Sequence, residues 1–311
     1  MDLIYEYILF LLKFSTCIIF ALLFLIFFVK ILKKNKLQNS KLRIIDLSRY
    51  YNQTIFQILS RLFNHRLKEY NFKKSILFKN KSTLYVLEFI GDMHASEVSN
   101  LRKEISIIIS IAKPDDEVLL KLESAGGTVH EYGLAASQLQ RLRKKGIKLT
   151  VVIDKIAASG GYMMACVANY IYSAPFAIIG SIGVIGQLPN LNKLLKKYNI
   201  DFELHTSGSY KRNLTLFGEN KDIHRIHFQN KLNSTHQLFK TFVQEMRPVI
   251  NITEVSNGDY WFGRVALINK LVDEIGTSDD VIVNMMKKFH VIRIYHKKSK
   301  GFFTRFTNYF F

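Results

Sequence analysis

Strand-like and helix-like patterns alternate along this chain from Leu84 onward, and this alternation limits the folds that the chain can adopt. Strands are predicted at residues 84–89, 118–122, 149–154, 170–173 and 202–206. Helices are predicted between the first four strands, at residues 96–112, 128–144 and 160–168. Such alternation is typical of an α/β protein with a largely parallel sheet. One more helix is predicted at residues 220–246, and we expect it to pack on the sheet or on a neighbouring subunit.

Ser159 stands where the predicted strand at 149–154 is followed by a helix, in the sequence Ala157-Ala158-Ser159-Gly160-Gly161. Small residues on both sides allow a sharp turn, which would present the hydroxyl at a helix N-terminus. The arrangement is similar to the nucleophile elbow of hydrolases, whose G-x-S-x-G pattern is met here only at Gly161. Ser159 is therefore the predicted nucleophile.

Two glycines, Gly126 and Gly127, follow the predicted strand at 118–122. Acyl transfer needs N–H donors aimed at the developing oxyanion, and glycine lets the backbone approach that atom closely. We expect Gly160 and Gly126, or Gly127 in place of Gly126, to donate these hydrogen bonds. A phosphate-binding loop is the alternative, but the chain has neither the G-K-[ST] ending of a Walker A motif nor a G-x-G-x-x-G.

A serine hydroxyl becomes nucleophilic when a base removes its proton, and three side chains are candidates for this base. His130 is expected on a helix face, His205 lies in the predicted strand at 202–206, and Lys211 follows beside Arg212. A lysine serves as a base near neutral pH when burial or nearby cations lower its pKa by about 2 to 3 from about 10.4. We favour Lys211; the alternative is that it is one of many solvated cations among 44 Lys and Arg residues.

Five motifs occur in the order found in one family of serine peptidases. They are residues 119–130 with the two glycines, 157–165 with Ser159, Gly180-Ser-Ile-Gly-Val, Tyr210-Lys211-Arg212 and Tyr260-Trp-Phe-Gly263. On these motifs the chain resembles the signal peptide peptidase A type serine peptidases, with their SohB branch as the nearest match. The resemblance extends from residue 84 to residue 282.

The resemblance implies that Ser159 is the nucleophile and Lys211 the base, in a crotonase/ClpP-like fold. It also implies a peptide substrate, such as signal-peptide remnants or membrane-protein segments, and a ring-shaped homo-oligomer whose neighbouring chains complete the substrate groove. No cofactor is expected. The chain departs from the family at Ala125, where a proline is usual, and at Asn269-Lys270, where Gly-Leu is usual. Without the proline the glycine loop is less preorganised. Whether Ala125 lowers the activity is left open.

The segment Gly180 to Gly186 is apolar and spaced by glycines. It is suited either to pair with a substrate peptide by strand addition or to serve as a structural loop, and the sequence does not decide between them. Met163 and Met164, just after Ser159, are interpreted as packing residues rather than as a substrate surface.

Residues 14–29 are uncharged and apolar, and residues 8–12 extend this run past Lys13. That length is enough to span a bilayer. Asp2 and Glu6 precede the run where a signal peptide would begin with basic residues, so we favour a retained single-pass anchor in the inner membrane. Basic residues that follow the run favour the cytoplasmic side for the catalytic domain, whereas the family resemblance favours the outer side.

These patterns divide the chain into four parts. We expect a transmembrane anchor at 1–32, a basic and partly amphipathic linker at 33–80, a catalytic domain at 81–298 and a short aromatic and basic tail at 299–311. The amphipathic stretch from Leu47 to Tyr70 is suited to lie on anionic lipid or to be a solvated helical linker.

The net charge of +19 is compatible with nucleic-acid binding, but we predict no nucleic-acid partner, because the basic residues are dispersed and no nucleic-acid-binding motif is found. Contact with the anionic lipid bilayer explains the charge more simply. Neither the histidines nor the two cysteines have metal-ligand spacing, so we expect no metal and no disulfide. Two alternatives to a peptidase stay open: an inactive membrane scaffold of the same fold, and a crotonase-type enzyme acting on acyl-CoA.

Overall fold

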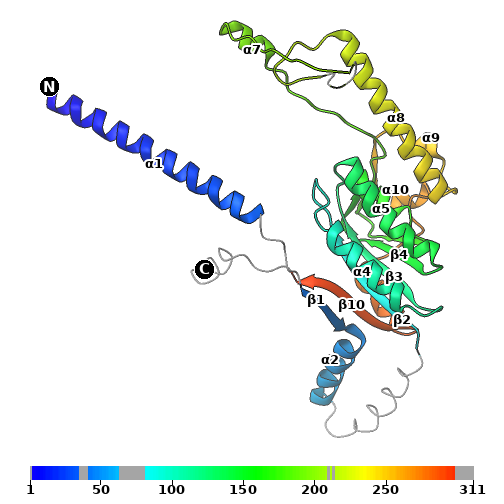
Figure 1. Ribbon diagram of the computed structural model, residues 1–311. Coiled ribbons are helices and arrows are strands. Elements are labelled where there is room, and N and C mark those ends of the chain that lie inside the picture. The colour runs from blue at the N-terminus through cyan, green and yellow to red at the C-terminus, as the bar shows by residue number, and fades with distance from the viewer. Residues whose placement is uncertain (1, 35–40, 63–80, 209–210, 212–213, 298–311) are drawn as a thin grey trace. The chain divides into compact units, whose positions relative to one another are not determined.

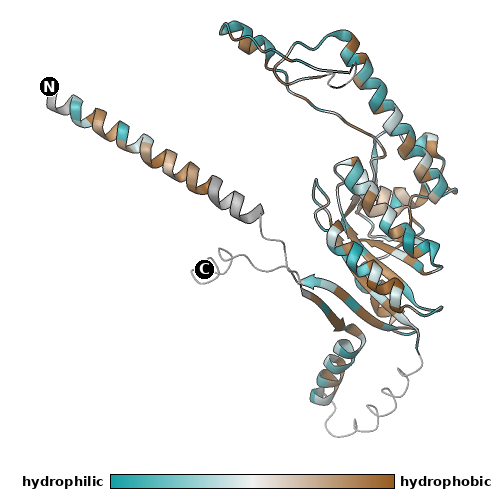
Figure 2. Ribbon diagram, viewed as in Figure 1, coloured by the Kyte–Doolittle hydropathy of each residue, from teal (hydrophilic) through white to brown (hydrophobic). Residues whose placement is uncertain are grey.

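The structure is a computed structural model, and it describes residues 2–34, 41–62, 81–208, 211 and 214–297. It divides into two compact units, residues 1–43 with 296–311 and residues 44–295. In the first unit, helix α1 (Asp2–Lys34) contains the span Tyr5–Ile26, whose mean hydropathy of 2.6 and length are sufficient to cross a membrane. Figure 2 shows mostly apolar colouring over the middle of α1. A retained anchor and a signal sequence share this composition.

The second unit is built on a seven-stranded sheet with the order β1-β10-β2-β3-β4-β6-β9 (Figure 1). Its strands are β1 (Lys41–Asp46), β2 (Thr83–Ile90), β3 (Glu117–Glu123), β4 (Lys148–Ile153), β6 (Tyr170–Ser173), β9 (Glu274–Ile275) and β10 (His290–Lys297). Every neighbouring pair from β10 to β9 is parallel. The predicted α/β class with a largely parallel sheet is confirmed.

The three central strands form the core because they are apolar along nearly their whole length. Leu84 and Leu87 of β2, Leu119 of β3 and Val151 of β4 are fully buried. Strands covered on both faces have such continuous apolar runs. Helices α4 (Val98–Ile111) and α5 (Val129–Lys144) connect β2 to β3 and β3 to β4, which confirms the predicted alternation.

A second, three-stranded sheet lies at the end of β3. It consists of β5 (Ile156–Ala158), β7 (Ile178–Gly180) and β8 (Tyr260–Phe262), with β5 parallel to β7 and β7 antiparallel to β8. Ser124, the residue after β3, forms a parallel bridge to Ala157 of β5. This bridge places the loop after β3 next to the turn after β5, where Ser159 lies.

Between β7 and α8 (Asp222–Met246), the described residues 181–208, 211 and 214–221 form an extension, which contains α7 (Asn192–Lys197). The strand predicted at 202–206 is wrong, because the described residues 201–206 are neither strand nor helix and Phe202 and Leu204 are exposed. Apolar residues alone do not make a strand when no neighbouring strand accepts their backbone hydrogen bonds.

Helix α8 confirms the helix predicted at 220–246. Its buried residues, Phe239 and Val243, lie in the C-terminal half, while Ile223 and Ile226 near the N-terminus are exposed. Figure 2 shows α8 coloured mostly as hydrophilic. The helix is therefore buried most deeply near its C-terminal end.

One further helix, α2 (Leu47–Leu62), is long. The other helices are short: α6 (Gly160–Ala165), α9 (Ile252–Val255), α10 (Gly263–Ile268) and α11 (Ser278–Met285). α2 begins where the amphipathic stretch is predicted, but residues 63–80 lie outside the described residues, as does the tail at 299–311. The boundaries of the four predicted parts stay predictions.

Candidate active site

Ser159 occupies a sharp turn between β5 and α6. Its backbone has φ 52° and ψ −120°, a conformation that costs a non-glycine residue about 1–3 kcal/mol and is concentrated at functional sites. Its N–H donates to the carbonyl oxygen of Gly180 at 2.8 Å, and its carbonyl oxygen accepts a hydrogen bond from Met163 N–H at 2.9 Å. The turn is therefore strained and held from both sides, as the predicted elbow requires.

The two residues after Ser159 are glycines because neighbouring atoms leave no room for a side chain. A Cβ atom at Gly160 would lie 2.4 Å from Cγ of Tyr132. A Cβ atom at Gly161 would lie 2.4 Å from the carbonyl oxygen of Ser124. These two contacts bring the start of α6 against α5 and against the end of β3.

The loop formed by Gly126 and Gly127 lies directly beside Ser159. Gly126 has φ 88°, and a Cβ atom there would lie 2.7 Å from the nitrogen of Gly160 and 2.8 Å from Cβ of Ser159. The N–H of Gly126 donates to Ser124 Oγ at 3.0 Å, so it is engaged inside the protein. Gly127, with Ser159 and Gly160, lines one small pocket. The structure thus brings the predicted nucleophile and the predicted donor loops together.

That pocket has a volume of about 20 Å³, close to the volume that one water molecule occupies. Its walls are mainly apolar and come from three helices and one loop: Val129, Met163, Val184 and Phe239, with Thr235 and Gly183. Met163 and Met164 are both buried, in agreement with the predicted packing role, and Met163 also borders the pocket. A pocket of this size fits a small side chain.

The glycine-spaced segment after β7 runs past this pocket. Gly183 and Val184 line it, and Ile185 is 83% exposed. The described residues 181–191 form neither helix nor strand. Their backbone is held on one side by α8, where His236 Nε2 lies 3.2 Å from the carbonyl oxygen of Ile182. An extended segment therefore lies beside Ser159. This arrangement is compatible with both predicted roles, pairing with a substrate peptide and serving as a structural loop.

None of the three candidate bases is among the residues that line the Ser159 pocket. Lys211 lies on the extension and is exposed. Its backbone N–H donates to the carbonyl oxygen of Gly208 at 3.1 Å. The His130 side chain is 80% exposed on α5, on a helix face as expected. His205 is exposed 3.3 Å from Glu203. In the single chain, the pocket of the predicted nucleophile is therefore lined by none of the predicted bases.

Other chemical groups near the site have structural surroundings. Cys166 is fully buried at the end of α6, and burial raises the pKa of its thiol to about 12, so it stays protonated and unreactive. Within the described residues no group of three or more His, Cys, Asp or Glu side chains is placed to hold a metal ion.

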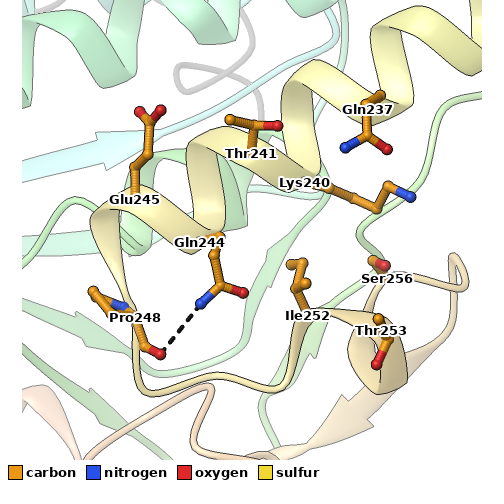
Figure 3. Close-up of a pocket in the computed structure, with 9 residues that line it drawn as sticks. All are labelled: Gln237, Lys240, Thr241, Gln244, Glu245, Pro248, Ile252, Thr253 and Ser256. Carbon is orange, nitrogen blue, oxygen red and sulfur yellow. Dashed lines mark hydrogen bonds between the residues drawn. The ribbon is translucent and has the colours of Figure 1, made fainter.

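A larger pocket of about 520 Å³ lies between α8 and α9 (Figure 3). Gln244 of α8 donates to the carbonyl oxygen of Pro248 at its rim, 3.2 Å away, and Ile252 and Thr253 of α9 form the opposite side. Neither Ser159 nor the glycine loops border it. It is therefore separate from the candidate active site.

Comparison with protein families gives two matches that together cover nearly the whole chain. The family described as peptidase family S49 matches residues 141–291, and the peptidase family S49 N-terminal description matches residues 2–139. The boundary between them falls inside α5, between the two loops that meet at Ser159.

Curated relatives agree with the family match. A probable protease SohB from Buchnera aphidicola of Acyrthosiphon pisum is 54% identical over 99% of this chain and 94% of its own length. A probable protease SohB from Haemophilus influenzae is 53% identical over 73% of this chain and 65% of its own length. Among solved structures, a ClpP1 mutant from Listeria monocytogenes matches 67% of this chain and 98% of its own, with 14% identity and a TM-score of 0.41.

Proposed function

This chain belongs to peptidase family S49 and is a serine peptidase, and from that premise we propose that it is a membrane-anchored endopeptidase with a Ser159/Lys211 dyad. The observation that carries the proposal is the strained turn at Ser159, in contact with the Gly126–Gly127 loop. Strain at a serine and adjacent backbone donors are what acyl transfer needs.

The chemistry assigns one step to each group. Lys211, in its neutral form, accepts the proton of the Ser159 hydroxyl while Oγ attacks the peptide carbonyl carbon. The tetrahedral intermediate collapses, the C–N bond breaks, and the leaving amine takes the proton from the lysine. Water then attacks the acyl carbon while the lysine accepts a proton from it. The bond between that carbon and Ser159 Oγ breaks, the lysine returns the proton to Oγ, and the carboxylic acid product is released with the serine hydroxyl restored.

The oxyanion of the intermediate is bound by backbone N–H groups of the two glycine loops. Gly160 supplies one donor, since the first N–H groups of a helix have no partner within the helix. The Gly126–Gly127 loop supplies the other. Gly127 borders the pocket while the N–H of Gly126 is bonded to Ser124, and this favours Gly127 as the second donor.

The substrate is an extended peptide with a small apolar residue before the cleaved bond. The small pocket beside Ser159 and its walls of Val129, Met163 and Val184 support this. The exposed segment after Gly180 supports pairing of the peptide backbone by strand addition. Signal-peptide remnants and membrane-protein segments have this character.

The first unit supports the anchoring part of the proposal. Helix α1 has a 22-residue span of apolar composition, and the basic residues that follow it favour a cytoplasmic catalytic domain in the inner membrane. We assign residues 1–32 to the anchor, 33–80 to the linker, 81–298 to the catalytic domain and 299–311 to the tail. Its partners are then the lipid bilayer and the peptide substrate.

The extension supports a homo-oligomer, in the form of a ring. It exposes many large apolar side chains, including Ile185, Leu194, Tyr198, Ile200, Phe202 and Leu204. Exposed apolar groups on a short segment indicate an interface. Lys211 belongs to the same extension, so assembly is the step that brings a lysine to each serine.

The experiment that tests this function is covalent labelling of the detergent-solubilised full chain with a serine-reactive phosphonate, followed by intact mass measurement. We expect labelling at Ser159 and its loss in Ser159→Ala and Lys211→Ala, with Lys211→Arg almost as severe. Ser137→Ala on α5 and Lys193→Ala on α7 are matched controls that should label like the wild type.

Three outcomes would redirect the proposal. An assembled, folded protein without any labelling would favour the inactive scaffold. Binding of CoA by the purified protein would favour the crotonase-type enzyme, whereas this proposal expects no such binding. Labelling that persists in the Lys211→Ala variant would show that another group is the base.

A further inference from the structure

A chain of hydrogen bonds runs from the glycine loop into the core through Ser124 and Tyr132. The N–H of Gly126 donates to Ser124 Oγ at 3.0 Å, Ser124 Oγ lies 2.6 Å from the Tyr132 hydroxyl, and that hydroxyl donates to the carbonyl oxygen of Asp92 at 2.8 Å. The single hydrogen of Tyr132 is used for Asp92, so the Ser124 hydroxyl donates to Tyr132. Each hydroxyl in the chain therefore both donates and accepts.

The two hydroxyl groups in this chain are shielded from water. Tyr132 is fully buried and Ser124 is 1% exposed. Gly91 closes the space on one side, because a Cβ atom there would lie 2.3 Å from the Tyr132 hydroxyl and 2.4 Å from Ser124 Oγ. Water has no access to replace a lost bond, so the direction of the Gly126 peptide depends on these two side chains.

The ring of the same tyrosine contacts the second glycine loop. A Cβ atom at Gly160 would lie 2.4 Å from Cγ of Tyr132 and 2.7 Å from its Cβ. The ring also packs edge-on against Phe89 of β2, with 6.4 Å between the ring centroids. One buried side chain thus contacts Ser124, which precedes the Gly126–Gly127 loop, through its hydroxyl and Gly160, at the start of α6, through its ring.

We propose that Tyr132 is a positioning residue of the oxyanion hole, which orients the Gly126–Gly127 loop through Ser124 and sets the location of Gly160 through its ring. With the Gly126 N–H turned inward to Ser124, the N–H of Gly127 is the one left for the substrate. This inference rests on the proposed function, since it concerns the same site.

The hydroxyl acts by geometry and not by proton transfer. Burial raises the pKa of Tyr132 above its usual value, so the group stays protonated across the range in which peptidases work. It is separated from the pocket by Ser124 and Gly126, and it does not line the pocket. A substitution of Tyr132 should weaken binding of the oxyanion and leave the affinity for the rest of the peptide unchanged.

The test compares two inhibitors of one peptide sequence on the full chain in detergent. A peptide aldehyde adds to Ser159 and places its oxygen in the oxyanion hole, whereas the matching peptide alcohol only fills the groove. For Tyr132→Phe we expect the inhibition constant of the aldehyde to rise about tenfold or more, since a lost oxyanion donor costs roughly 100-fold or more and a misplaced one costs less. The inhibition constant of the alcohol should not change.

Ser124→Ala breaks the same chain one link closer to the glycines and provides a second variant. It should cause a similar loss for the aldehyde, and the double variant should lose little more, because the chain is already broken. Tyr85→Phe is the control: Tyr85 is also buried and its hydroxyl lies 3.5 Å from the Asp116 carboxylate, at the other end of β2. The ratio of the inhibition constants of the aldehyde and the alcohol in this variant should match that of the wild type.

The outcomes separate this inference from the proposed function. Wild-type binding of the aldehyde with an unchanged ratio in both Tyr132→Phe and Ser124→Ala would overturn the inference alone. An equal loss for aldehyde and alcohol would also overturn it, because a general structural role would then explain the effect. A wild type that does not bind the aldehyde would overturn the proposed function and this inference with it.

Discussion

The guanidinium group of Arg247 donates to both carboxylate oxygens of Asp273, at 2.8 and 3.0 Å. Its Nε also donates to the carbonyl oxygen of Lys270 at 2.7 Å, and Asp273 accepts a further hydrogen bond from the N–H of Ile171. Arg247 follows the last residue of α8 and Asp273 precedes β9. The pair therefore fixes the end of α8, the helix that supplies Phe239 to the Ser159 pocket.

Arg247→Leu should lower the free energy of unfolding by about 3 kcal/mol, because it leaves a partly buried carboxylate without its main partner. Urea denaturation of the full chain in detergent measures this. Arg225→Leu is the matched control, since its pair with Asp222 on α8 is exposed and should contribute less than about 1 kcal/mol. Similar losses in both variants would contradict the buried role of Arg247.

Gly161→Ala should abolish phosphonate labelling and destabilise the protein by about 1–3 kcal/mol, because the new Cβ would overlap the carbonyl oxygen of Ser124. Gly133→Ala on α5 is the control, with no atom within 4 Å of its Cβ position. It should stabilise the helix by about 0.5–1 kcal/mol and keep labelling. Thermal unfolding and intact mass report both effects, and retained labelling in Gly161→Ala would refute the tight contact.

Met163→Ala should enlarge the pocket beside Ser159 and shift substrate preference toward larger side chains. We expect the ratio of kcat/KM for a leucine-containing over an alanine-containing peptide to rise about tenfold or more, since a single methylene group in an apolar pocket changes this ratio by roughly tenfold or more. Met164→Leu is the control, because Met164 is buried but does not border the pocket. An unchanged ratio in Met163→Ala would show that this pocket does not hold the substrate side chain.

Cys166 should not react with a disulfide reagent in the folded protein. In the Cys17→Ser variant it is the sole thiol of the chain, and its pKa of about 12 keeps it protonated at pH 8 and at pH 10. Absorbance after addition of the reagent should change only when denaturant unfolds the chain. Rapid reaction of the native protein, with a rate that increases between pH 8 and 10, would show that the thiol is accessible and ionised.

Co-expression of a Ser159→Ala chain with a Lys211→Ala chain should restore labelling, because Lys211 is exposed on an extension suited to contact a second copy. The label should be found on the Lys211→Ala chain, which keeps its serine. Pairing the Lys211→Ala chain with a chain that carries both substitutions is the control and should give no label. Mixed oligomers that copurify but stay unlabelled would show that each lysine serves its own serine.

The parts of the fold that were predicted from the sequence are those with long periodic patterns. The central strands and helices α4, α5 and α8 were predicted within two residues of their bounds, since buried strands and packed helices impose regular spacing on apolar residues. Strands β5, β7 and β8 have three residues each, too few for a period to be seen. β10 pairs with β2 from the opposite end of the chain, and that contact leaves no local signal.

The sequence identified the parts of the candidate site that stand in short motifs, and it missed the residues that reach the site from other elements. Ser159 and the glycine pair stand in short motifs, and the structure places them in contact. Thr235 and Phe239 reach the same pocket from α8, and their role depends on how that helix packs. In the sequence, Tyr132 has the helical spacing of an ordinary core residue. Its place a few residues after Ser124 and Gly126 was the signal that it could hydrogen-bond to the Gly126–Gly127 loop. The roles of Ser159, Gly126, Gly160 and Lys211 stay predictions.

The small sheet that holds Ser159 also sets the order of events during synthesis. The N–H of Ser159 is held by Gly180 of β7, and β7 in turn pairs with β8, whose last residue is Phe262. Because the chain emerges from the ribosome N-terminus first and domains fold as units, the strained turn has its full support only after residue 262 has been made. Ser159 therefore lacks the backbone support of its turn until most of the chain has been synthesised.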